Sequence, residues 1–245
     1  MRISAVVLII AISVALTGKV ILFICIFVCL DLILVCCIMS FICLFVDELP
    51  DTGYVEMIPQ NPLNLRAFTL CMRLGTELSM TTTERSIILF AYRTSQHDEL
   101  NVWQEVDGRL SLYLSGSSDG VLFQVPGLGA LHTHLCLTWD SSSGATALFM
   151  NGQRSLTKIY KKNHNVSSGG RVILGQDPDS LLGDFDADQS FVGEIYDVNM
   201  WSSVLSDSTI QDMFAGRAVP RPDILDWETA ELRRNGDTTM IEHEL

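Results

Sequence analysis

Basic side chains are scarce in this sequence. The 245 residues contain 16 Lys and Arg against 29 Asp and Glu, a formal net charge of −13. Setting aside Arg2, Lys19 and Asp31 leaves 14 bases and 28 acids in residues 47–245, a net charge of −14. Because binding of nucleic-acid phosphates needs clustered Lys and Arg, we expect no nucleic-acid specificity. An acidic surface of this kind is either simply solvated or a host for divalent cations.

Charge of either sign is almost absent from the N-terminal region, where only Lys19 and Asp31 are charged between Ile3 and Val46. Residues 3–16 are typical of a signal-peptide core, and residues 20–45 are long enough to span a bilayer. The positive-inside rule directs the C-terminal part outward. We predict a hydrophobic signal peptide or signal-anchor at 1–46, with a misassigned start of translation as a third possibility. Residues 47–245 are then secreted or extracellular.

Cysteines are few outside this leader. Five of the seven lie within residues 25–43, so Cys71 and Cys136 are the pair that remains for the folded part. In an oxidising compartment an even pair predicts one disulfide. Closing a loop of about 66 residues would stabilise the fold by roughly 4 kcal/mol in the chain-entropy model.

Most of residues 66–201 follows short apolar runs and period-2 alternation. The candidate strands are 67–72, 86–92, 109–114, 120–125, 134–139, 145–150, 171–175 and 191–201. Asn151-Gly152 predicts a type I′ hairpin turn. Ser206 as N-cap and Gly216 as stop predict a helix over 206–215. We expect an all-β fold, a two-sheet antiparallel β-sandwich or jelly roll of the concanavalin-like lectin type, with this one short α-helix.

The stretch HTHLCLTWDSSSG, residues 132–144, gathers groups that could bind metal or act as nucleophiles. Alternation places His134, Cys136 and Thr138 on one face of a strand. A zinc site would need further Cys or His ligands at recognisable spacing, and the remaining histidines are isolated. Cys136 also has a disulfide partner available. We therefore interpret this stretch as a structural strand.

The same stretch carries a family resemblance. The pattern His134-x-Cys136-x-Thr138-Trp139-x-Ser141 resembles the signature of the pentraxin family at every fixed position. Further ordered similarities lie at 174–180, 189–201 and 224–227. The resemblance implies a core strand, a disulfide between Cys71 and Cys136, and a ring oligomer, usually a homopentamer.

Aspartates crowd one loop of the sequence, at positions 177, 179, 184, 186 and 188. Packing so many like charges is destabilising unless a cation compensates them or the loop is open and hydrated. An EF-hand is excluded, because Gln189 and Ile195 stand where that loop needs glycine and glutamate.

The pentraxin resemblance implies two adjacent calcium ions at this loop. The first ion would be bound by Asp98, Asp177, the main-chain carbonyl of Pro178, and Asp179. Asp177 and Asp179 would bridge to the second ion, which Asp186 and Gln189 would complete. Relatives commonly have Glu at positions 177 and 186, so side chains about 1.5 Å shorter predict a weaker second ion. Asp98-Glu99 replaces an Asp-Asn pair, and Glu99 either takes the asparagine's role or points away.

The function implied by the resemblance is calcium-dependent pattern recognition in innate immunity. The ligands would be phosphocholine-type or phosphoethanolamine-type headgroups, or carbohydrates, on microbes and damaged cells, with complement components as possible partners. Trp103 is a candidate for packing against the ligand, the alternative being a core tryptophan, and an acid facing a quaternary nitrogen would fall around Asp119-Gly120. The alternative function is a membrane-anchored pentraxin in cell adhesion or clustering.

Two further expectations concern chemistry on the exported domain. We expect no enzymatic activity, because the E-x-D-x-x-E strand common in related glycosidases is lacking. Asn165-Val166-Ser167 is a sequon for N-glycosylation.

Overall fold

The computed structural model describes residues 6–16, 19–29, 40–46, 53–78, 85–236 and 238–244. The chain divides into two compact units, Met1–Met39 and Ser40–Leu245. In the first unit, strands β1 (Val6–Leu16) and β2 (Lys19–Cys29) form an antiparallel hairpin. Within the described part of the chain, no helix is both long and apolar enough to cross a membrane. Part of the predicted leader lies outside the described residues, and its processing stays a prediction.

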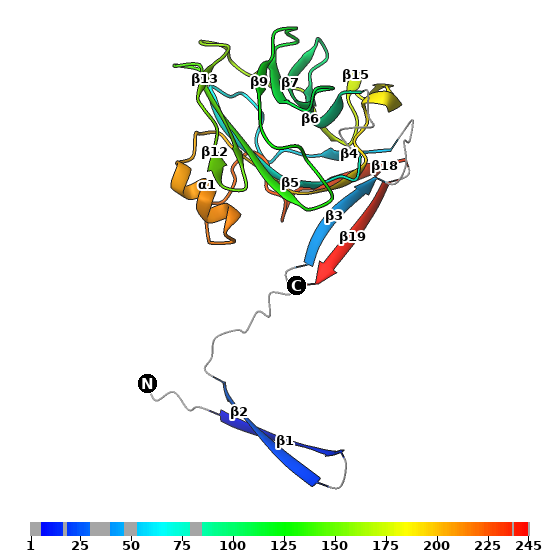
Figure 1. Cartoon of the computed structure of the whole chain (residues 1–245), viewed down its shortest axis with the longest axis vertical. Coiled ribbons are helices and arrows are strands. Elements are labelled where there is room, and N and C mark those ends of the chain that lie inside the picture. Colours follow the sequence, from blue (N-terminus) through cyan, green and yellow to red (C-terminus); the bar gives the residue numbers. More distant parts are fainter. Residues whose placement is uncertain are drawn as a thin grey trace. The chain divides into compact units, whose positions relative to one another are not determined.

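The second unit contains two large antiparallel sheets, a two-stranded hairpin and a short helix (Figure 1). The larger sheet has the order β12-β11-β10-β5-β17-β3-β19, and β13 also pairs with β11. Its strands are β3 (Ser40–Val46), β5 (Ala67–Gly75), β10 (Thr133–Asp140), β11 (Ala145–Met150), β12 (Gln153–Arg154), β13 (Lys158–Ile159), β17 (Gly193–Trp201) and β19 (Thr238–Glu244). β3 pairs with β17 and β19, so Ser40–Val46 is part of this unit, and the predicted division between leader and domain at residues 46 and 47 stays a prediction.

The smaller sheet has the order β18-β4-β14-β6-β7-β8-β9. Its strands are β4 (Tyr54–Met57), β6 (Ile87–Arg93), β7 (Asp98–Gln104), β8 (Leu110–Leu114), β9 (Val121–Phe123), β14 (Arg171–Leu174) and β18 (Leu232–Asn235). The loop between β14 and β17 forms a hairpin of β15 (Pro178–Ser180) and β16 (Gly183–Phe185), followed by the 3-10 helix η1 (Ala187–Gln189). The loop as a whole holds the aspartate-rich segment.

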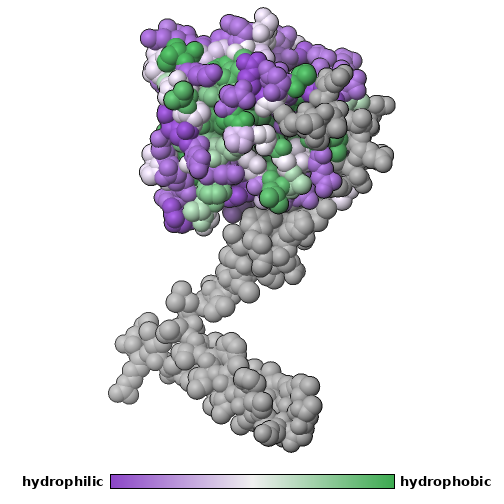
Figure 2. Space-filling model, viewed as in Figure 1, coloured by the Kyte–Doolittle hydropathy of each residue, from purple (hydrophilic) through white to green (hydrophobic). Residues whose placement is uncertain are grey.

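The main hydrophobic core fills the space between the two sheets, as expected for a β-sandwich. Alternate residues of β5 supply Phe68, Leu70, Met72 and Leu74, and all four are buried. The inward side chains of β10 and β7 complete this layer. In Figure 2 the visible face of this unit mixes hydrophilic and hydrophobic residues without one continuous apolar area. The all-β sandwich prediction is confirmed.

Local signals in the sequence are also confirmed where they were strongest. The helix α1 (Asp207–Phe214) begins after Ser206, whose hydroxyl accepts a hydrogen bond from the Thr209 amide. The β11–β12 turn places Asn151 and Gly152 at φ 50° and 75°, the left-handed conformations that a type I′ turn requires. The amide of His134 donates to the Asn151 side chain at 2.9 Å, so the turn is fastened to β10.

Candidate metal centre

The candidate metal centre forms where the β15–β16 hairpin lies against β6 at the start of β7. Asp177 is its innermost carboxylate, with 6% of its surface exposed. Burial, and then the nearby carboxylates of Asp98 and Asp179, raise the pKa of Asp177 to about 7. The amide nitrogen of Asn101 donates to Asp177 Oδ1 at 2.9 Å. Three of the predicted ligands are therefore brought together around one poorly solvated point.

Arg93, the last residue of β6, is inserted into this group of acids. Its Nη1 lies 2.5 Å from Asp98 Oδ1, and its Nη2 donates to the main-chain oxygen of Asp179. The guanidinium thus joins β7 to β15 through an acceptor on each. Its positive charge also opposes the rise in the pKa of Asp177.

The register of the hairpin positions the rest of the predicted set. Pro178 pairs with Phe185 and Ser180 with Gly183. Asp177 directly precedes β15 and Asp186 directly follows β16, so both residues stand at the open end of the hairpin. Asp186 is also the N-cap of η1, where its side chain accepts from the Asp188 amide at 2.9 Å. Gln189 ends this helix.

Two buried amide oxygens beside the acids have no hydrogen-bond partner among the described residues, Asn101 Oδ1 and Gln189 Oε1. A buried acceptor left unpaired is destabilising, so these two oxygens are available as ligands for a cation. Calcium takes six to eight oxygen ligands from carboxylates, amides and main-chain carbonyls. The residues present supply all three kinds of oxygen, so the donor set fits calcium.

Glu99 points away from this centre. Its buried carboxylate contacts His97 Nε2 at 2.6 Å and His164 Nε2 at 3.2 Å, and it accepts from the Ser167 amide at 2.7 Å. Asn101, two residues further along β7, is the side chain that reaches Asp177 instead. Sequence analysis missed Asn101, although a polar residue between the apolar Leu100 and Val102 was an available signal.

Trp103 lies on the same face of β7 as Asn101, because the two are separated by two positions in a strand. It is half-buried and packs against a small cluster that is separate from the main core, formed by Ile88, Ala91 and Ile173, with Phe185 from the hairpin. Trp103 is therefore not part of the main core, and it stands beside the metal centre. Its role in ligand binding stays a prediction.

The predicted acid near Asp119-Gly120 has different surroundings. A Cβ atom on Gly120 would lie 2.5 Å from a ring carbon of Tyr113, so this aromatic ring covers the glycine. The Tyr113 hydroxyl donates to Glu105 at 3.0 Å, whereas Asp119 is exposed and pairs with Lys161 at 3.4 Å. Glu105 is thus the carboxylate bonded to Tyr113, and the role of an acid around Asp119-Gly120 stays a prediction.

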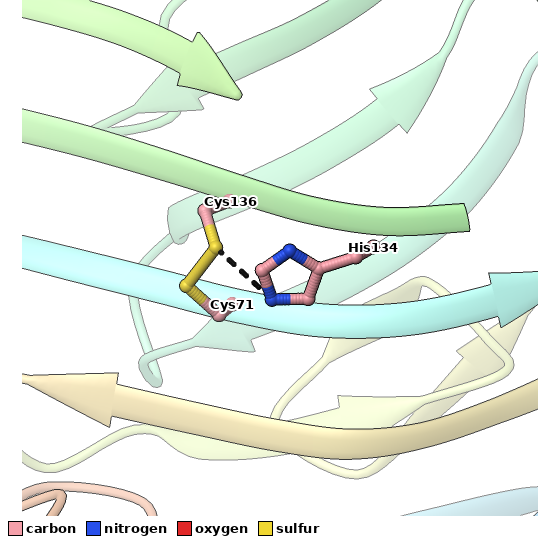
Figure 3. Close-up of side chains that lie close together, drawn as sticks. All are labelled: Cys71, His134 and Cys136. Carbon is pink, nitrogen blue, oxygen red and sulfur yellow. Dashed lines mark hydrogen bonds between the residues drawn. A yellow bond between two sulfur atoms is a disulfide. The ribbon is translucent and has the colours of Figure 1, made fainter. Parts of the chain in front are cut away.

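The HTHLCLTW stretch forms β10, and its cysteine is in a disulfide. Cys71 and Cys136 face each other across β5 and β10 and are bonded, with His134 Nε2 3.5 Å from the Cys136 sulfur (Figure 3). Burial and then the charge of Arg73 lower the pKa of His134 to about 4. Both thiols are used in the disulfide, so the structural interpretation of this stretch is confirmed.

The predicted glycosylation site lies beside a bridge that joins distant segments. Leu65 and Val166 form an isolated β-bridge, and the side-chain nitrogen Nδ2 of Asn165 donates to Asn64 Oδ1 at 2.8 Å. Asn165 itself is partly exposed. Its glycosylation stays a prediction.

Comparison with known proteins places this sandwich among relatives of the same architecture. A sequence model of the Pentaxin family matches residues 44–241. C-reactive protein of Danio rerio is 49% identical over 191 residues, which cover 78% of this chain and 84% of that protein. Serum amyloid P-component of Sus scrofa is 37% identical over 186 residues, 76% of this chain and 80% of that protein. A heptameric SAP-like pentraxin from Limulus polyphemus superposes with a TM-score of 0.70 at 21% identity, covering 83% of this chain and 95% of that one.

Proposed function

The chain belongs to the pentraxin family, and from this premise we propose that it is a calcium-dependent pattern-recognition protein. The observation that supports calcium most directly is the convergence of Asp98, Asp177 and Asp179 beside the unpaired, buried oxygen of Asn101. A divalent cation would neutralise the carboxylates, and it would satisfy that oxygen once the Asn101 side chain turned Oδ1 toward the metal. This side of the smaller sheet would then be the binding face.

The first calcium ion would be bound by Asp98, Asp177, Asp179 and the main-chain carbonyl of Pro178. We add the Asn101 side-chain oxygen to this set, in the role that Glu99 cannot take while it contacts His97 and His164. Loading of this ion would require Asn101 to present Oδ1 rather than its NH₂ group to the metal.

A second, weaker ion would lie toward η1. Asp177 and Asp179 would bridge to it, and Asp186 and Gln189 would complete it. The position of Asp186 directly after β16 and the unpaired Gln189 oxygen support this placement. The shorter reach of aspartate compared with glutamate favours lower affinity.

Bound calcium with open coordination positions would accept oxygens from an anionic or polyhydroxylated ligand. We propose phosphocholine-type or phosphoethanolamine-type headgroups, or carbohydrates, on microbes and damaged cells as the ligand classes, with Trp103 packing against the ligand. Because one such site binds weakly, a homopentamer would gain strength by multivalency, and complement components could act downstream. Recognition without catalysis is the activity proposed.

We further propose that the protein is secreted, with Asn165 glycosylated, and keep a membrane-anchored pentraxin in cell adhesion as the alternative. Sequencing the N-terminus of protein collected from the culture medium separates the two. A mature end after the apolar runs supports secretion, whereas full-length protein retained in the membrane fraction supports the anchor.

Calcium titration by calorimetry tests the central proposal. Asp179→Asn should weaken calcium binding by more than about tenfold, since it removes a charged bridging ligand. Asp107→Asn is the matched control, because Asp107 is exposed and pairs with Arg109 away from the centre. Equal affinity of Asp179→Asn and the unsubstituted protein would refute the site. Calcium-dependent retention on a phosphocholine or phosphoethanolamine resin, with elution by EDTA, tests the ligand class.

A further inference from the structure

Arg93 has an unusual position for a basic residue near a candidate calcium site. Its side chain is only 14% exposed, and its guanidinium contacts Asp98 Oδ1 at 2.5 Å and the main-chain oxygen of Asp179. Both contacts involve residues of the proposed calcium-binding set. The guanidinium therefore provides a positive charge among the same acids that calcium would neutralise.

An arginine and a calcium ion use these oxygens in the same way. A guanidinium carries only donors, so each contact occupies an acceptor lone pair that a metal would otherwise take. Arg93 Nε is buried and has no hydrogen-bond partner among the described residues, so the side chain is held there by charge and not by a complete set of bonds. Such a side chain can be displaced when a stronger cation arrives.

The other arginine that touches this loop behaves differently. Arg85 Nη1 donates to the Ala187 carbonyl at 2.9 Å, on the η1 side of the loop. Ala187 is outside the proposed ligand set, although the charge of Arg85 also acts on Asp186 and Asp188. Of these two arginines, Arg93 is the one whose guanidinium directly contacts oxygens proposed for the first calcium ion and its segment.

We propose that Arg93 is a built-in counter-cation that occupies the first calcium position in the metal-free protein and must be displaced when calcium binds. This inference rests on the proposed calcium-binding function and concerns the regulation of that same site. In the metal-free state Arg93 keeps the β15 segment fastened to β6 and β7. In the loaded state calcium takes over the oxygens of Asp98 and the 177–179 segment.

The expected effect on affinity follows from the population of the occupied state. Suppose that the state with Arg93 in the site is about ten times more populated than the state with Arg93 outside it. The apparent calcium affinity is then lowered about tenfold. Removing the guanidinium should raise the apparent calcium affinity by the same factor. It should also leave the carboxylates uncompensated without calcium, so the metal-free protein should unfold at a lower temperature.

The test compares Arg93→Gln with the unsubstituted chain and with Arg109→Gln. The control removes the same charge from a partly exposed residue just before β8, where Arg109 pairs with Asp107. Calcium dissociation constants come from calorimetry of EDTA-treated protein, and unfolding temperatures are measured with and without calcium. We expect Arg93→Gln to bind calcium about tenfold more tightly than the unsubstituted chain. Without calcium it should unfold at a lower temperature, and adding calcium should raise its unfolding temperature by more. Arg109→Gln should match the unsubstituted chain in all three measurements.

Equal or weaker calcium binding by Arg93→Gln would overturn the inference, because Arg93 would then merely orient Asp98 for the metal. Should that variant not fold, Arg93→Lys decides: it keeps the charge but cannot span both acceptors, so tighter binding supports competition and equal or weaker binding overturns it. Binding by Arg93→Gln but not by the unsubstituted chain supports the inference and overturns the proposed function. Absence of binding in both overturns both.

Discussion

Replacing Asp177 by Asn should stabilise the calcium-free protein while removing its response to calcium. Burial beside two other carboxylates raises the pKa of Asp177 from its ordinary 3.8 to about 7 in the folded protein. An unfolded chain ionises this group near pH 4, so folding becomes less favourable as pH rises from about 4 to about 7. At pH 7.5 the penalty, at 1.36 kcal/mol per pKa unit, is on the order of 4 kcal/mol.

Asparagine at position 177 avoids this penalty, because it is neutral at every pH. It keeps an oxygen that can accept the bond from the Asn101 amide. The variant should therefore unfold at higher denaturant concentration than the unsubstituted protein in EDTA at pH 7.5, and the difference should vanish near pH 4. Calcium in the millimolar range should stabilise the unsubstituted protein and not the variant, so the difference between them should shrink, and it would cancel at about 1,000 times the dissociation constant.

Urea unfolding at pH 4 and 7.5, with EDTA or calcium, measures all these quantities. Asp107→Asn serves as the control, because it removes a carboxylate that is exposed and paired with Arg109. The reasoning is refuted if Asp177→Asn is less stable than the unsubstituted protein in EDTA at pH 7.5. It is equally refuted if calcium stabilises both proteins to the same extent.

Two further predictions concern other parts of the sandwich. Burial lowers the pKa of His134 to about 4, so the stability it contributes is complete above its unfolded pKa of 6.5 and is lost as pH falls toward 4. Between pH 7 and 4.5 this loss should be about 2.5 kcal/mol in urea unfolding, and His134→Gln should lack that part of the pH dependence. Trp103→Ala should reduce retention on a phosphocholine resin several-fold while its calcium affinity stays unchanged. A parallel loss of calcium binding would show that Trp103 supports the fold around the site and not the ligand.

Much of the fold followed from local patterns. The strand predicted at 145–150 and the observed β11 have the same bounds, because alternation, the Asn151-Gly152 turn and burial all agree there. β7 was not predicted, since Asp98, Glu99 and Asn101 interrupt the alternation expected of a strand. Asp98 and Asn101 belong to the candidate site, whereas Glu99 contacts His97 and His164.

The site itself was only partly accessible from the sequence. The crowding of aspartates indicated the loop that contains Asp177 and Asp179. The contributions of Arg93 and Asn101 depend on the pairing of β6 with β7, which places Asn101 opposite Ala91 and has a register shift between Tyr92 and Arg93. Such pairing is set by packing of the whole sheet, and single-sequence patterns do not contain it.

A crystal structure of the protein grown in millimolar calcium tests the central claim most directly. We expect an ion about 2.3–2.6 Å from oxygens of Asp98, Asp177, Asp179 and Asn101, with the Arg93 guanidinium turned out of the site. An ordered loop with no ion, and Arg93 still bound between Asp98 and Asp179, would contradict the account.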